Sequence, residues 1–140
     1  MPHNVRDAQL IVTKALPAST SAVNSPGIDL AHAAAGRDLE AGMEVLLSAP
    51  ALALTELPDT KTMTYKLQMD EDVAFGTPTN IYGSDLIVQT GATGTDPCAA
   101  ATKRIKLPSN CERYIRAVAT PAGSGTGDCS GKSLTLELLF

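Results

Sequence analysis

The sequence predicts an all-β fold: an antiparallel β-sandwich of the jelly-roll type with a partly extended N-terminal arm. Short apolar runs recur along the 140 residues, and turn residues such as glycine and proline separate them. Several runs alternate apolar and polar residues with a period of two, and no strong amphipathic helix intervenes. The long first connections suit a jelly roll. An immunoglobulin domain is disfavoured because its Cys–Trp–Cys core is absent.

Residues 1–27 are predicted to form the arm, and residues 28–140 a single sandwich domain. The arm has one apolar patch, Leu10-Ile11-Val12, which we expect to be the first short strand. The Ser, Thr, Pro and Gly residues that follow favour turns and extended backbone over helix. Residues 28–42 are rich in Ala, but Gly36 and Gly42 would end a helix early, so a loop with at most one helical turn is expected.

The clearest strand signal covers residues 62–70. Its polar residues, Asp70 included, alternate strictly with apolar ones, which places the polar set in water and the apolar set against the core. The apolar set is Met63, Tyr65, Leu67 and Met69. Residues 133–140 repeat the pattern, and there the shared face carries Leu134, Leu136, Leu138 and Phe140. Further strands are expected at residues 43–49, 52–57, 85–90, 102–107 and 113–120.

Composition and charge disfavour several classes of partner. Apolar residues make up 44% of the chain and charged residues 19%, which is typical of a globular protein. A net charge of −4 disfavours binding to nucleic acid or to an anionic membrane. The polar start has no signal-peptide core, and no apolar run approaches the roughly 18 residues that span a bilayer. We therefore expect synthesis in the cytoplasm of the host cell and no membrane partner.

The cysteines and histidines do not have the spacing of a metal site. Cys98, Cys111 and Cys129 form no closely spaced pair, and His3 and His32 lie far from them in the sequence. A structural zinc site needs four ligands, which usually come in such pairs. Free, reduced thiols and no metal are therefore predicted.

Two further segments resemble ligand-binding motifs only superficially. The Gly-rich segment 123–133, GSGTGDCSGKS, ends like a P-loop, but Thr126 stands where the first glycine is required and a strand follows instead of a helix. A flexible hairpin loop is the simpler interpretation. The acidic run at residues 70–72 lacks the further ligands of a calcium loop and is typical of a solvated turn. No cofactor is predicted.

Catalytic residues are also not apparent. A nucleophilic Ser or Cys needs a histidine held beside it, and only folding could bring His32 near Cys111 or Ser84. The carboxylates are scattered, and aromatic platforms for sugars are scarce. We therefore predict that the protein is not an enzyme.

A cluster of basic residues is the one charge feature with a functional interpretation. Five of the eleven basic residues lie between positions 103 and 116. If the strands at 102–107 and 113–120 are neighbours, their outward side chains form a basic stripe with one aromatic ring, which would dock an acidic protein surface. The alternative is a solvated sheet face that the acidic run at 70–72 balances. The candidate protein-binding residues are Arg104, Lys106, Arg113, Tyr114 and Arg116.

Three segments resemble a known family. They are SPGIDLAHAAAGRDLEAGMEVLL, KLQMDEDVAFGTPTNIYGSDLI and KRIKLPSNCERYIRAVATPAG, and with the closing strand they extend from about residue 27 to residue 140. Their motifs, the IDL…GRDL opening, DVAFGTPT and RYIR, resemble those of the small capsid cement, or decoration, proteins of tailed bacteriophages. The resemblance implies a jelly-roll fold and no enzymatic activity.

The same resemblance implies a structural role on the virion. The chain would bind the exterior of the capsid, bridge neighbouring major capsid subunits and stabilise the shell against the pressure of packaged DNA. Two-fold dimers are the commonest oligomers, so a homodimer is the first expectation and a trimer the second. The alternative function is a small-molecule or sugar-binding jelly-roll module, which would require a concave pocket ringed by polar groups.

Overall fold

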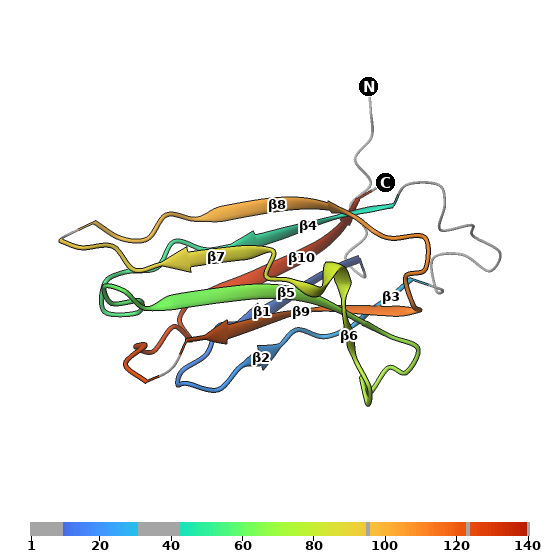
Figure 1. The fold of residues 1–140 in the computed structure, drawn as a ribbon, viewed down its shortest axis with the longest axis horizontal. Coiled ribbons are helices and arrows are strands. Elements are labelled where there is room, and N and C mark those ends of the chain that lie inside the picture. Colours follow the sequence, from blue (N-terminus) through green and yellow to red (C-terminus); the bar gives the residue numbers. More distant parts are fainter. Residues whose placement is uncertain (1–9, 31–42, 95, 123, 140) are drawn as a thin grey trace, which may run out of the picture.

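The computed structural model describes residues 10–30, 43–94, 96–122 and 124–139, and it is an all-β sandwich of two antiparallel sheets (Figure 1). Sheet A has four strands in the order β1-β10-β4-β8, and sheet B has six. The strands of sheet A are β1 (Ile11–Ala15), β4 (Glu44–Ala49), β8 (Ala101–Lys106) and β10 (Ser133–Leu139). The predicted antiparallel sandwich is therefore confirmed at the level of its two layers.

Sheet B is built around two long central strands, β5 (Thr62–Asp70) and β9 (Tyr114–Pro121). Two-residue strands β2 (Val23–Asn24) and β3 (Ile28–Asp29) pair in succession with β9. On the far side of β5 lie β6 (Thr79–Asn80) and β7 (Ile87–Thr90), and the 3-10 turn η3 (Ile81–Gly83) connects them. The sequence pattern did not reveal β2, β3 or β6, because two residues are too few to show a period.

The gap between β2 and β3 is closed by a side chain. Ser25 donates its backbone N–H to the carbonyl of Ala117, and its hydroxyl oxygen accepts the Ala117 N–H at 2.9 Å. Pro26, which has no N–H to donate, follows immediately. Both sheets therefore contain residues of the segment 10–30, through β1 in sheet A and through β2 and β3 in sheet B.

Side-chain alternation fills the space between the sheets. Met63, Tyr65 and Leu67 of β5 are fully buried, and Met69 is 8% exposed, which confirms the predicted inward face. Leu134, Leu136 and Leu138 of β10 are also buried as predicted, whereas Phe140 lies outside the described residues. With few aromatic rings available, aliphatic side chains build the core, for example Leu16, Ile28, Val45, Leu47, Ile105, Ile115 and Leu134.

The prediction of a strand at residues 52–57 is wrong. Leu52 makes only an isolated bridge with Cys98, and the chain then turns, with the N–H of Leu57 donating to the carbonyl of Ala53 at 2.8 Å. The carboxylate of Glu56 accepts the N–H of Ala53 at 2.7 Å and so stabilises the turn. A turn is required here because the chain leaves sheet A after β4 and enters sheet B at β5.

The Gly-rich segment is not a hairpin, which corrects a second prediction. It connects β9 of sheet B to β10 of sheet A, so it crosses between the two layers. Gly127 donates its N–H to the carbonyl of Glu56 at 2.9 Å, and a Cβ at this position would lie 1.8 Å from the carbonyl oxygen of Thr55. Only glycine permits this close approach. Of the predicted loop at 28–42, residues 28–29 form β3, and residues 31–42 lie outside the described part.

Candidate protein-binding surfaces

The five candidate docking residues divide between the two sheets. Arg104 and Lys106 belong to β8, the edge strand of sheet A, whereas Arg113 precedes β9 of sheet B and Tyr114 and Arg116 lie in it. β8 pairs with β4, and β9 pairs with β2, β3 and β5. The two strands are not neighbours, so the predicted continuous basic stripe does not form. The prediction failed because sheet membership depends on long-range pairing that the sequence pattern does not contain.

Arg116 holds a loop against the outer face of sheet B. Its Nε and Nη2 both donate to Oε1 of Gln68, at 3.0 and 2.8 Å, and its guanidinium carbon lies 4.3 Å from the ring centroid of Phe75. Burial lowers the pKa of Arg116, and the charge of Asp70 acts in the opposite direction. Arg116 is therefore engaged with its own chain.

Phe75 belongs to the loop of residues 71–78, which we call the Phe75 loop and which lies over this end of sheet B. Phe75 is only 8% exposed, and a Cβ added to Gly27 would lie 2.9 Å from its Cε2 atom. Phe75 has a left-handed backbone, with φ of 52°. Because Gly27 has no side chain, the Phe75 ring can occupy the space beside it.

Asp70 is buried, which corrects the prediction that it points into water. The residue is 4% exposed, and its two carboxylate oxygens accept the N–H groups of Asp72 and Thr77, each at 2.9 Å. A carboxylate that accepts backbone N–H groups at both ends of a loop fixes the shape of that loop. The acidic run therefore includes a structural residue as well as solvated ones.

Arg113 and Tyr114 are also held within the domain. The Nε and Nη2 of Arg113 donate to the two oxygens of Asp29, at 3.0 and 2.9 Å, and the guanidinium carbon lies 5.0 Å from the Tyr114 ring centroid. The hydrogen bonds to Asp29 raise the pKa of Arg113. These two hydrogen bonds connect β3 to the residue that precedes β9. At this edge of sheet B the basic charge is therefore matched by a carboxylate of the same chain.

The outer face of sheet A has a different character. The strand register aligns four hydroxyl residues across all four strands, and beside them lies a mixed row. The hydroxyl row is Thr13, Thr135, Ser48 and Thr102, and the mixed row is Ile11, Glu137, Leu46 and Arg104. A third row holds Leu139, Glu44 and Lys106.

This face is open. Among the described residues, every side chain of the three rows is at least partly exposed, and Arg104 and Lys106 are exposed. Arg104 forms an ion pair with Glu44 at 3.3 Å, with its side chain 66% exposed. The face therefore presents small hydroxyls, three aliphatic side chains and charges of both signs on four adjacent strands.

Both edges of sheet A carry a lysine on the inward-facing side of the strand. Lys14 of β1 pairs with the buried Leu134, and Lys103 of β8 pairs with the buried Leu47, yet both lysines are exposed. Cross-strand partners share a face of the sheet, so each lysine stands beside the core at the rim of the sandwich. A charged side chain in this position opposes the addition of another strand to the edge.

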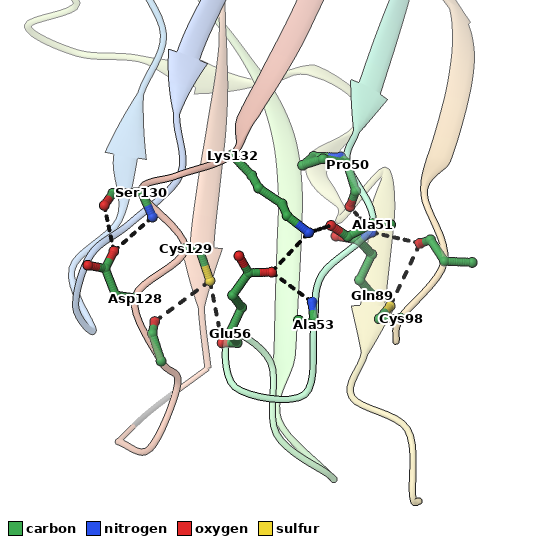
Figure 2. A network of polar contacts seen from close by, with 12 residues as sticks. Pro50, Ala51, Ala53, Glu56, Gln89, Cys98, Asp128, Cys129, Ser130 and Lys132 are labelled. Atoms are coloured by element: carbon green, nitrogen blue, oxygen red, sulfur yellow. Dashed lines mark hydrogen bonds and ion pairs between the residues drawn. The ribbon is translucent and has the colours of Figure 1, made fainter. Parts of the chain in front are cut away.

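A polar network joins the loops at the end of the sandwich where β4 leads to β5 (Figure 2). The ammonium of Lys132 donates to the carbonyl of Ala51 at 2.6 Å and lies 3.1 Å from a carboxylate oxygen of Glu56. The thiol of Cys129 donates to the carbonyl of Glu56 at 3.4 Å. This network fixes the crossing from β9 to β10 against the turn after β4.

A second part of the same network contains a buried glutamine. The amide oxygen of Gln89 accepts a hydrogen bond from the hydroxyl of Tyr65 at 2.7 Å. Its amide nitrogen donates to the carbonyls of Pro50 and Ala99, at 2.8 and 2.9 Å. Burial raises the pKa of the Tyr65 hydroxyl, so it remains protonated and acts as a donor. The amide oxygen of Gln89 thus bonds to β5, and its amide nitrogen joins the two loop residues Pro50 and Ala99.

Burial limits the chemistry available at two of the three thiols, Cys111 and Cys129. Burial raises the pKa of Cys129, and it raises the pKa of Cys111 to about 11, with Glu112 and Glu71 adding to the effect. All three cysteines are free. No group of three His, Cys, Asp or Glu side chains suited to a metal ion occurs in the described ranges. His3 and His32, and the suggested approach of His32 to Cys111 or Ser84, lie outside those ranges.

Comparison with other proteins adds no family to these observations. No protein-family model matches the chain, and no curated protein is significantly similar to it. Within the part of the chain that the structure describes, no helix is both long and apolar enough to cross a membrane. The surfaces of the sandwich are therefore the features that bear on function.

Proposed function

We propose that this chain is a structural capsid cement protein with no catalytic activity and no cofactor, which binds the outside of a tailed-phage shell through the outer face of sheet A. The observation that carries the proposal is the contrast between the two outer faces. Sheet A is open over four strands, whereas the Phe75 loop and internal ion pairs occupy one end of sheet B. The sequence resemblance to cement proteins supplies the identity of the partner, the major capsid protein.

The strand order supports the finer assignment to the jelly-roll class. Counting β2 and β3 as one interrupted strand, and β6 and β7 as another, gives eight successive strands. The first pairs with the eighth, the second with the seventh, the third with the sixth and the fourth with the fifth. This nesting is expected when one long antiparallel hairpin rolls up into two sheets, as in a jelly roll.

The physical properties of sheet A suit a cementing role. Hydroxyl and short aliphatic side chains on central strands lose little conformational entropy when a partner covers them. The lysines at both edges oppose the pairing of a further strand, which avoids uncontrolled strand addition. Many copies on one shell act together, so each contact can be of ordinary size. We propose a homodimer as the bridging unit, with a trimer as the second choice.

The test is co-sedimentation of the full-length protein with shells assembled from the major capsid protein of its own phage. Thr135→Arg places a large charged side chain in the centre of the sheet A face, between the strands that carry Thr13 and Ser48. We expect it to weaken shell binding more than about 10-fold, since a buried unpaired charge at an interface costs several kcal/mol.

A matched control makes the same change on the other sheet. Thr64→Arg also replaces a half-buried threonine on a central strand, but it lies on the outer face of sheet B. We expect this variant to bind shells within about 2-fold of wild type. If the wild type does not bind these shells, the cement function is wrong. If Thr135→Arg binds as well as Thr64→Arg does, the assignment of the face is wrong.

The stabilising role is tested on the shells themselves. Shells with the bound protein are expected to keep their DNA to a higher temperature and through a stronger osmotic shock than shells without it. DNA release followed with an intercalating dye gives the temperature. Equal release temperatures would contradict cementing. Binding of a sugar or another small molecule in place of shells would favour the alternative function.

A further inference from the structure

Tyr82 is held in place, yet its ring is exposed. The hydroxyl donates to the carbonyl of Lys106 in β8 at 2.6 Å, and the residue is 58% exposed. The backbone is left-handed at both Tyr82 and Gly83, with φ of 60° and 63°. Asn-Gly adopts this pair of angles most readily, and a residue such as tyrosine loses about 1 kcal/mol or more there. The backbone conformation disfavours tyrosine at this position, so the reason for a tyrosine here lies in its side chain.

The strand that Tyr82 contacts carries an excess of positive charge. Lys103, Arg104 and Lys106 of β8 are all exposed, and of these Arg104 has an ion pair with Glu44. β7 runs beside β8 at this margin of the sandwich (Figure 1) and carries no charged residue. The protein as a whole has a net charge of −4. Glu44 of the neighbouring strand lies opposite Lys106, so three cations of the edge strand stand beside one adjacent carboxylate. Such an excess of cations at one edge of an acidic protein favours an acidic partner and orients it.

We propose that Tyr82 and the three basic residues of β8, together called the β8 edge, bind an acidic, extended segment of the partner protein. The proposal rests on the proposed function and deepens it, because it gives the chemistry of the shell segment. The cations meet its carboxylates, and the Tyr82 ring supplies a rigid apolar contact. Arg104 and Lys106 of the original candidate set keep a docking role.

The mode of binding and the class of partner follow from two observations. Lys103 stands at the inward side of the edge, so the segment lies along the side chains and does not join the sheet as a new strand. Single-stranded nucleic acid would need several rings for base stacking, and the described residues of the β8 edge provide one. An acidic protein segment is therefore favoured over single-stranded nucleic acid.

The first experiment separates a docking role of Tyr82 from a purely structural one. Tyr82→Asn fits the left-handed backbone but removes the ring, and Tyr82→Phe keeps the ring but removes the hydroxyl. We expect Tyr82→Asn to lower affinity for the shells by about 10-fold or more, and Tyr82→Phe to stay within about 3-fold. If Tyr82 only joins η3 to β8, both variants lower the Tm and neither changes the affinity, and the proposal is overturned.

The second experiment does not depend on shells. Full-length protein is titrated at low salt with a synthetic peptide of alternating Glu and Leu, and backbone amide shifts are followed by NMR. Shifts are expected at β8 and η3, and added salt should reverse them. Lys103→Glu should weaken peptide binding by about 5-fold or more, whereas Lys14→Glu, an exposed lysine at the opposite edge of sheet A, should change it by less than about 2-fold.

The outcomes of the two experiments are distinguishable. If shells do not bind but the peptide binds at β8, the cement function fails and the β8 edge stands as a site for acidic segments. If the wild type binds shells, and the variants Lys103→Glu and Tyr82→Asn bind them with the same affinity, the cement function stands and the β8 edge is refuted as a binding site. Tighter binding of a thymidine oligonucleotide than of the peptide would overturn the choice of carboxylates.

Discussion

The two outer faces of the sandwich are both formed by strands whose side chains alternate between the core and the surface. They differ in how far the chain itself covers their basic side chains. On sheet B, Arg116 stacks on Phe75 and bonds to Gln68, so its charge serves the fold. On sheet A, Arg104 and Lys106 remain exposed, and the ion pair of Arg104 with Glu44 leaves its side chain 66% exposed. The comparison teaches that a basic residue on a β-strand is a candidate for docking only when its own chain does not already cover it.

The largest expected effect comes from removing the cover of sheet B. Phe75→Ala should destabilise the protein by about 2 to 3 kcal/mol, because the ring is buried between Arg116 and Gly27 and its loss leaves a cavity. Val73→Ala is the matched control in the same loop, since Val73 is 65% exposed. It should cost about 0.5 kcal/mol or less. Urea unfolding measures both, and equal losses would refute the packing of the loop.

A somewhat smaller loss is expected from the carboxylate that shapes the same loop. Asp70→Ala removes the buried carboxylate that accepts two part-buried hydrogen bonds, from the N–H groups of Asp72 and Thr77, and should cost about 2 kcal/mol. Asp72→Ala removes a single exposed hydrogen bond, to the N–H of Ala74, and should cost about 0.5 kcal/mol. Thermal unfolding of the two variants gives the comparison. A larger loss for Asp72→Ala than for Asp70→Ala would contradict this account.

The edges of sheet A should affect association more than stability. The double variant Lys14→Val and Lys103→Val should change the free energy of unfolding by less than about 1 kcal/mol, but it should promote edge-to-edge aggregation. Lys66→Val, on central strand β5 of sheet B, is the control. Light scattering at increasing concentration is the measurement. A double variant that remains as dispersed as the control would show that these lysines do not protect the edges.

The smallest effect concerns thiol reactivity and leaves the fold intact. Because the pKa of Cys111 is about 11, its thiolate fraction at pH 8 is very low, so alkylation should be at least about 10-fold slower than at the half-exposed Cys98. The rate at Cys111 should rise as the pH increases toward 11, as long as the fold persists. Mass spectrometry of peptides after timed alkylation measures both sites. Equal rates at pH 8 would contradict the burial of Cys111.

Local patterns predicted most of the long strands. The alternation in β5 and β10 correctly gave their inward faces, because a period of two is a property of the strand itself. The alternation pattern failed at Asp70, where a loop folds back over the sheet. The strand predicted at residues 52–57 is absent because the apolar side chains there are buried in a turn. Two-residue strands such as β2 and β6 have no detectable pattern.

The candidate site shows the same division. The opposite orientations of Arg104 and Ile105 could be predicted from neighbouring positions, and the structure agrees, with Ile105 buried and Arg104 exposed. Tyr82 was missed because a single aromatic in a short polar segment carries no period. The Tyr-Gly pair in a turn was the one available signal, since a bulky residue there is unfavourable.

The sequence by itself determined that this chain forms strands, which side chains of the longest strands face inward, and that its aliphatic residues must build the core. These follow from interactions between residues close in the chain. Only the tertiary structure decided which strands are neighbours, which basic residues the chain itself covers, and which face remains open. Those features depend on contacts between residues as distant as Asp29 and Arg113, and no local pattern records such contacts.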